Sequence, residues 1–193
     1  TTEAFAGSSR TQDNSQNVVA VGEEIKKQLE AAGFGVVHDT TCHDYPSYNG
    51  SYDRSGETIQ RNLEKYPDIQ VTLDVHRDAM GTQDGMRIKP TALINGKKAA
   101  QVMIISGCDD DGTLGFPNWE YNLRLGVRIQ KSLSDLYPGL ARPLSFCPKK
   151  YNEHMTKGSL LVEFGTEVNT LEEVKYSGQL FGKALAETLE QLT

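Results

Sequence analysis

The sequence lacks several features that define large functional classes. Its three cysteines, Cys42, Cys108 and Cys147, are too few and too scattered for a disulfide framework or a cysteine-based zinc site. No apolar run approaches the ~20 residues of a membrane-spanning helix. Basic residues do not predominate, because the sequence contains 20 Lys and Arg residues and 26 Asp and Glu residues. The net charge of −6 argues against binding to nucleic acid or to an anionic membrane.

Motifs for common cofactors and nucleophiles are also missing. There is no glycine-rich phosphate loop, no Walker A motif and no dinucleotide-binding fingerprint. The Gly-x-Ser-x-Gly elbow of many serine hydrolases is absent as well. The acidic run at 109–112 lacks the alternating spacing and the distant glutamate of a calcium loop, so it is interpreted as a solvated turn.

What is present is an ordinary globular composition, with 37% hydrophobic and 24% charged residues over 193 positions. This length predicts a single domain over residues 1–193, and the start at Thr1 suggests a fragment of a longer chain. Alternating helical and strand patterns predict an α/β fold with a mainly parallel sheet flanked by helices in three layers. Asn95-Gly96 predicts an added antiparallel hairpin. Helices are expected over 17–32, 55–66, 119–136 and 170–192, and strands over 34–37, 69–75, 86–94, 97–105 and 160–162.

Capping residues set the expected helix starts. Asn14 or Ser15 would cap the first helix, and Ser55 the second. Thr170 and Glu173 form the pattern of a capping box at the start of the last helix.

Polar residues gather where the apolar strands end, which is where open α/β sheets bind ligands. His76 follows the strand over 69–75, and Asp74 lies two residues before it, on the same face of the strand. A histidine held by a carboxylate is a common metal-ligand arrangement. The alternative is a polar strand end that simply meets water.

Glu163 lies inside an apolar run, after Leu160-Leu161-Val162. Burying a carboxylate charge is costly, so this group is expected to pair with a cation or a metal, or to have a raised pKa. A raised pKa suits a general base that activates water. The alternative is a structural ion pair with Arg54 or Arg77.

The sequence thus offers one histidine at a strand end, one glutamate within an apolar run, and no obvious nucleophile. This combination suggests metal-assisted hydrolysis. Zinc normally takes three protein ligands and a water molecule, and His76 is one candidate ligand. His43 could touch substrate from its tyrosine-rich loop, although it and His154 are as readily explained as surface or loop histidines.

Several segments together resemble the stage II sporulation protein P family, over nearly the whole chain. They are the 38–55 segment HDTTCHDYPSYNGSYDRS, DVHRDA at 74–79, PNW at 117–119, LVEFG at 161–165 and NTLEE at 169–173.

The resemblance implies a zinc-dependent N-acetylmuramoyl-L-alanine amidase that cleaves peptidoglycan and also cuts peptide cross-links. It implies Zn²⁺ as cofactor and a lytic transglycosylase of sporulation as partner. It also implies an extracytoplasmic enzyme of endospore engulfment, between the mother-cell and forespore membranes. Its membrane anchor would lie outside this chain.

The same resemblance assigns individual roles. His76 matches the second zinc histidine, and Glu163 matches the water-activating glutamate. Thr1-Thr2-Glu3 is similar to the tail of the family's His-Thr-His-Thr-Thr-Glu segment, so the first zinc histidine would lie before Thr1. Glu3 is the favoured third ligand, and Asp13 is the alternative.

Arg54 and Arg77 are predicted to bind substrate carboxylates, since arginine binds them in a bidentate manner. His154 is predicted to stabilise the tetrahedral intermediate. Two other functions stay open: a zinc carboxypeptidase that trims free peptides, and a peptidoglycan-binding module without catalysis.

Overall fold

Apolar residues at helical spacing form the helices of the computed structural model, which describes residues 10–192. They are α1 (Val18–Ala31), α2 (Ser51–Lys65), α3 (Trp119–Leu136), α4 (Leu171–Glu190) and the short 3₁₀ helix η1 (Glu153–Met155). The capping box of α4 is confirmed. The hydroxyl of Thr170 accepts the Glu173 N–H at 3.2 Å, and the Glu173 carboxylate accepts the Thr170 N–H at 3.0 Å.

The predicted capping residues of the first two helices were wrong. Asn17 caps α1, and its side-chain oxygen accepts the Val19 N–H at 2.9 Å. The second helix begins at Ser51, after Gly50 with a φ of 78°, because this left-handed residue turns the chain into the helix one turn before Ser55.

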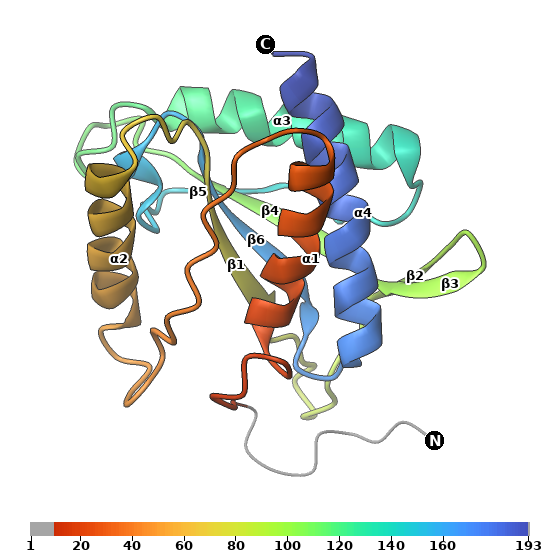
Figure 1. The fold of residues 1–193 in the computed structure, drawn as a ribbon. Coiled ribbons are helices and arrows are strands. Elements are labelled where there is room, and N and C mark those ends of the chain that lie inside the picture. Colours follow the sequence, from red (N-terminus) through yellow and green to blue (C-terminus); the bar gives the residue numbers. More distant parts are fainter. Residues whose placement is uncertain (1–9, 193) are drawn as a thin grey trace.

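The central sheet has the strand order β1-β6-β4-β5. β1 (Thr72–Asp78) is parallel to β6 (Ser159–Thr166), and β4 (Val102–Gly107) is parallel to β5 (Ser145–Cys147). Among the described strands of this sheet, only the β4–β6 pair is antiparallel. The α/β fold with a mainly parallel sheet and flanking helices is therefore confirmed (Figure 1).

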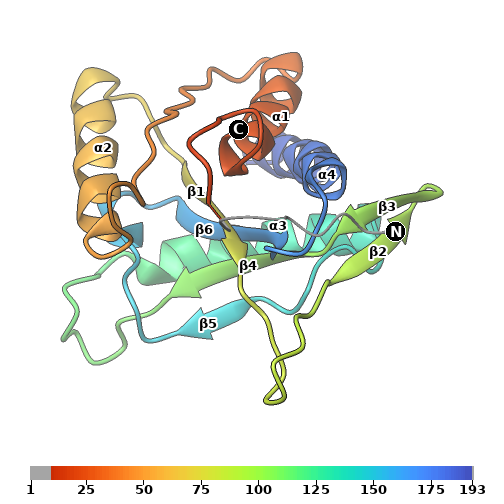
Figure 2. The same cartoon turned by 90° about the horizontal axis from the view of Figure 1, so that it is seen from below.

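The predicted hairpin exists and forms its own two-stranded sheet, which projects from the body of the molecule (Figure 2). β2 (Thr91–Ile94) and β3 (Lys97–Ala100) are joined by Asn95 and Gly96, whose positive φ angles of 51° and 76° suit a tight hairpin turn. Both strands are shorter than predicted. Pro90 has no N–H to offer a ladder, and β3 stops before Gln101, whose N–H bonds to the Pro90 carbonyl.

The strand predicted over 34–37 was wrong. In the described part of the chain this segment joins no strand ladder. Phe34 and Val36 nevertheless pack against the hydrophobic core, as their apolar character predicts. An apolar run becomes a strand only when a neighbouring strand supplies its hydrogen bonds.

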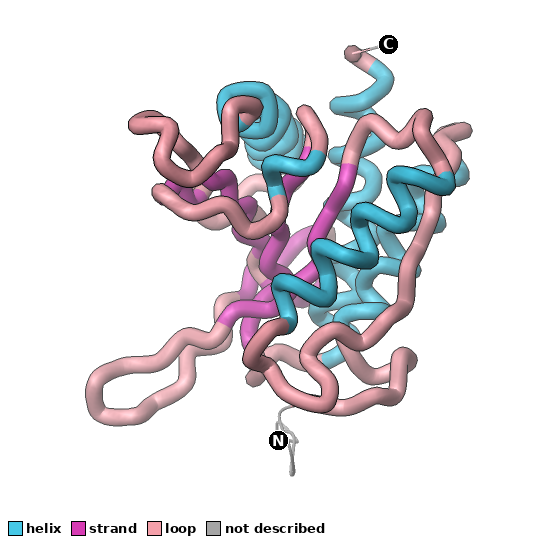
Figure 3. Tube along the Cα trace, turned by 90° about the vertical axis from the view of Figure 1, so that its left-hand side faces the viewer, coloured by secondary structure: helices cyan, strands magenta, loops and turns pink. Residues whose placement is uncertain are grey.

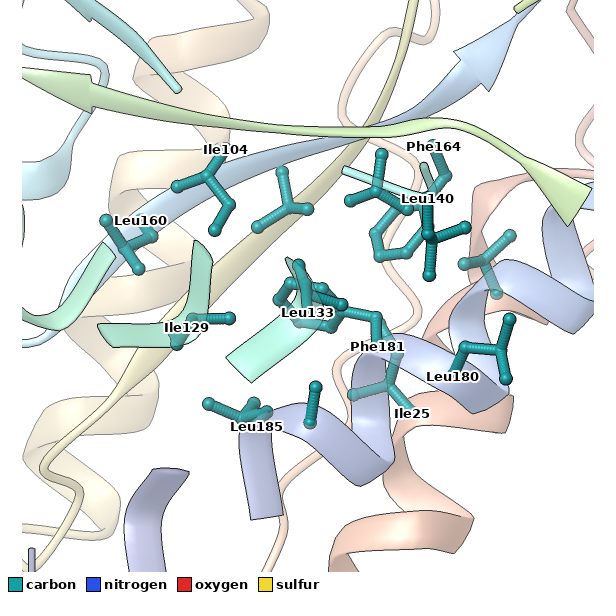
Figure 4. Packing of buried hydrophobic residues seen from close by; sticks show 14 of the residues in the cluster. Ile25, Ile104, Ile129, Leu133, Leu140, Leu160, Phe164, Leu180, Phe181 and Leu185 are labelled. Atoms are coloured by element: carbon teal, nitrogen blue, oxygen red, sulfur yellow. The ribbon is translucent and has the colours of Figure 1, made fainter. Parts of the chain in front are cut away.

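The core lies between one face of the sheet and the helices α1, α3 and α4. Ile104, Leu160 and Phe164 from the sheet meet Ile129 of α3 and Phe181 of α4 there (Figure 4). Figure 3, seen from the side of α2, shows this helix in front of the sheet. No helix within residues 10–192 is long and apolar enough to cross a membrane.

Candidate functional site

The pairing of β1 with β6 brings the two principal predicted site residues together. His76 and Glu163 are direct partners in the parallel ladder, so their side chains lie on the same face. Asp74 shares this face, because side chains alternate along a strand. The intervening residues Leu73 and Val75 pack against the core on the opposite face.

His76 is held in place from two sides. Its Nε2 lies 3.0 Å from Oδ1 of Asp74, and its ring stacks on Tyr52 of α2 with 6.0 Å between ring centroids. Burial alone would lower the pKa of His76. The hydrogen bond to Asp74 and the negative charges of Asp74 and Glu163 outweigh this effect, so the pKa lies above its ordinary value.

Glu163 is buried, with 9% of its surface exposed, and its Oε2 has no hydrogen-bond partner among the described residues. Burial raises the pKa of Glu163 to about 7. The negative charges of Asp78 and Asp74 raise this pKa further, whereas the positive charges of His76 and Arg142 lower it. Arg142 is itself engaged, since its guanidinium lies 2.8 Å from Oδ2 of Asp78. This environment suits a carboxylate that accepts and returns a proton near neutral pH.

These residues fit part of a cation site. Oδ2 of Asp74 is also buried without a hydrogen-bond partner, so two unsatisfied carboxylate oxygens lie near His76. Within residues 10–192, however, no group of three His, Cys, Asp or Glu residues is arranged to hold a metal ion. Glu3, the favoured ligand, lies outside the described residues. Asp13 is exposed, and its carboxylate accepts the Ser15 N–H at 2.9 Å and the Ser15 hydroxyl at 2.7 Å.

The two predicted substrate-binding arginines have different surroundings. The Arg54 guanidinium donates to the backbone carbonyls of His43 at 2.8 Å and Asn49 at 3.3 Å, and also to that of Ser47. This geometry favours a role in ordering the 43–49 loop. Arg77 is half-buried, near the charges of Glu167, Asp44 and Arg10. Substrate binding by either arginine stays a prediction.

The two remaining predicted histidines belong to different segments of the chain. His43 is hydrogen-bonded through Nε2 to Thr58 of α2 at 2.9 Å. Burial lowers its pKa, against the raising effect of nearby Asp74. His154 lies in η1, where burial also lowers its pKa and its Nδ1 has no hydrogen-bond partner among the described residues. Contact of either histidine with substrate stays a prediction.

Two residues near the site were not anticipated from the sequence. Tyr52 covers the His76 ring and also contacts Tyr151, with 5.5 Å between centroids. Glu153 is 2% exposed, and its Oε2 accepts the Gly107 N–H at 2.8 Å. No local pattern marks either residue, because both depend on contacts with distant segments.

The site opens into a large cleft of about 1940 Å³ beside β1. Its wall includes Tyr52, Asp74, His76, Glu163 and Tyr151. The cleft therefore gives access to the His76–Glu163 pair.

Comparisons with known proteins bear on this site. The family model of Stage II sporulation protein P matches residues 1–186. A curated relative, Stage II sporulation protein P of Bacillus subtilis (strain 168), is 30% identical over 172 residues. The match covers 82% of this chain and 40% of that relative, so the chain spans less than half of the relative's length.

A solved structure has a similar fold. It is the CwlD amidase from Clostridioides difficile, determined in complex with the GerS lipoprotein. The TM-score is 0.55 at 11% identity, and the match covers 90% of this chain and 82% of that chain. At this identity the likeness shows the fold alone.

Proposed function

Because this chain belongs to the stage II sporulation protein P family, we propose that it is a zinc-dependent peptidoglycan hydrolase. The bond that we assign to it is the amide between N-acetylmuramic acid and L-alanine. The observation that carries this proposal is the buried Glu163 carboxylate, placed directly beside His76 at an open cleft. The fold shared with the CwlD amidase is compatible with the same class of reaction.

The residues of the site have distinct tasks in this reaction. His76 would hold Zn²⁺, and Glu3 and a histidine before residue 1 are the further predicted ligands. When bound, the ion supplies a Lewis acid that polarises the amide carbonyl and acidifies water. Glu163 takes a proton from the attacking water and returns it to the leaving amine nitrogen. Asp74 fixes the orientation of the His76 ring through its 3.0 Å contact.

The family also suggests a setting for this activity. We propose an extracytoplasmic role in endospore engulfment, with anchoring through a membrane segment outside this chain. Peptidoglycan is the proposed substrate, and a lytic transglycosylase of sporulation is the proposed protein partner. Cutting of peptide cross-links is a second proposed activity of the same site.

The decisive experiment compares Glu163→Gln with the unchanged intact protein on purified peptidoglycan. Soluble products are identified by mass spectrometry, and zinc is measured by elemental analysis. Loss of the general base is expected to lower the rate of lactyl–alanine cleavage by about 10²–10⁴-fold while zinc content is kept. Glu187→Gln, which changes an exposed carboxylate on α4, is the matched control and is expected to keep full activity.

Three outcomes would contradict the proposal. Full activity in Glu163→Gln would exclude this residue as the base. Products with new peptide termini and intact lactyl–alanine bonds would indicate a peptidase. Binding of peptidoglycan without any cleavage, and without zinc, would indicate a non-catalytic binding module.

A further inference from the structure

A row of aromatic rings leads away from His76 along the wall of the cleft. The His76 ring stacks on Tyr52 with 6.0 Å between centroids and 25° between planes, and the Tyr52 ring lies 5.5 Å from that of Tyr151. Lys149 ends the row, with its Nζ 5.7 Å from the centre of the Tyr151 ring. Tyr52 and Tyr151, here called the tyrosine pair, line the cleft and are partly exposed.

Backbone contacts hold the tyrosine pair in a fixed arrangement. Asn152 donates through Nδ2 to the Tyr52 carbonyl at 2.7 Å and to the Ser55 hydroxyl at 3.0 Å. These bonds tie the segment of Tyr151 to the first turns of α2. Tyr151 and Asn152 have φ angles of 44° and 62°, which are uncommon for residues other than glycine. Backbone of this kind persists where surrounding contacts hold it, and it is enriched at binding sites.

The tyrosine pair is not part of the packed interior. Among the described residues, Tyr137 and Tyr176 pack against the hydrophobic core, whereas Tyr52 and Tyr151 do not. Ligand pockets are commonly lined by aromatic side chains with a few polar groups beside them. The position of the pair in the cleft wall, next to His76, therefore points to contact with a ligand.

The chemistry of the tyrosine pair favours an uncharged ring as this ligand. Burial raises the pKa of the Tyr52 hydroxyl, and the charges of Asp74 and Glu163 raise it further, so the hydroxyl stays neutral. The same two charges repel the carboxylates of an acidic peptide. A pyranose ring is uncharged. Its C–H groups pack against aromatic faces, and its hydroxyls bond to polar groups at their edges.

We propose that Tyr52 and Tyr151 form a saccharide subsite, which binds an N-acetylated pyranose ring of the glycan strand. The identity of this substrate rests on the proposed function. Because the row of rings ends at His76, a sugar on the tyrosine pair would place its attached peptide beside the His76–Glu163 pair. The subsite would therefore favour peptides attached to glycan over free peptides.

Calorimetric titration of the intact protein with tetra-N-acetylchitotetraose, an oligomer of N-acetylglucosamine, tests the proposal. Tyr151→Ala is expected to weaken binding at least ~5-fold, whereas Tyr151→Phe keeps the ring and is expected to stay within ~2-fold of the unchanged protein. Phe146→Ala is the matched control, because it removes an exposed aromatic ring of β5 that does not line the cleft. It is expected to leave the affinity unchanged.

A second measurement does not depend on any variant. In the unchanged protein, nuclear magnetic resonance is expected to show contacts between protons of the bound saccharide and the rings of Tyr52 and Tyr151. Circular dichroism of each variant checks that the fold is kept. The dipeptide L-alanyl-D-glutamate, titrated in parallel, reports whether the same residues bind peptide instead.

Three results would overturn the inference: no binding of the saccharide, equal affinity in Tyr151→Ala, or a loss in that variant confined to the dipeptide. The saccharide contains no lactyl–alanine bond, so its binding is measured without cleavage. Loss of the subsite would leave the hydrolase proposal open. Conversely, saccharide binding at the tyrosine pair in a protein that cleaves no peptidoglycan would refute the hydrolase and leave the subsite.

Discussion

Replacing Glu153 with glutamine tests whether this buried carboxyl group makes the stability of the fold depend on pH. The side chain is 2% exposed, Oε2 accepts the Gly107 N–H at 2.8 Å, and Oε1 has no hydrogen-bond partner among the described residues. Burial raises the pKa of Glu153 to about 8, against the opposing hydrogen bonds from the backbone of Gly107 and Leu161. Glutamine keeps an oxygen for Gly107 and carries no titratable proton.

The raised pKa fixes the sign of the effect. In the folded protein the group keeps its proton up to about pH 8, whereas in the unfolded chain it loses the proton near its ordinary pKa of 4.5. Its contribution to stability is thus complete below pH 4.5 and is lost as the pH rises through 8. The gap between 4.5 and about 8, at about 1.4 kcal/mol per pKa unit, amounts to about 5 kcal/mol.

Urea denaturation at pH 5 and pH 9 measures this difference. The free energy of unfolding of the unchanged protein is expected to fall by about 3–5 kcal/mol more than that of Glu153→Gln between these pH values. Other groups, including Glu163, titrate in both proteins and cancel in the comparison. An identical pH dependence of the two proteins would refute the assignment of a buried, protonated Glu153.

Three further predictions concern stability and order. Gly165→Ala is expected to lower the free energy of unfolding in urea by about 2–4 kcal/mol, because φ is 61° and the new Cβ would lie 2.8 Å from the Cβ of Ala100. An unchanged unfolding midpoint would contradict this. Asn122→Ala leaves the Ser159 N–H and the Glu153 carbonyl unpaired in the core, so a loss of about 2–4 kcal/mol is expected in the same assay. Arg54→Ala is expected to speed proteolysis within 43–49 at least ~10-fold, since one hydrogen bond to a charged group is worth roughly 1.5–3 kcal/mol. Unchanged cleavage with weaker substrate binding would favour the substrate-binding role instead.

Local sequence patterns determined the regular elements with the strongest signals. Helix α3 has the predicted bounds, because its apolar spacing over 119–136 is continuous. The Asn95-Gly96 turn and the Thr170–Glu173 capping box act through neighbouring residues only, so the sequence is sufficient to predict them. The expectation that His76 and Glu163 share one edge also followed from local pattern, since both extend apolar strands.

The tertiary structure decided the features that depend on distant partners. Residues 34–37 are apolar enough for a strand, but pairing requires a neighbour that the described chain does not supply. Glutamate is usually a surface residue. Glu153 is buried instead, and it accepts a hydrogen bond from Gly107, which lies 46 residues away in the sequence. Tyr52, in the first turn of α2, contacts His76 of β1 although the two residues lie in separate elements. The spacing of apolar residues shows which side of a helix or strand is apolar. The residues that pack against that side depend on how the whole chain folds.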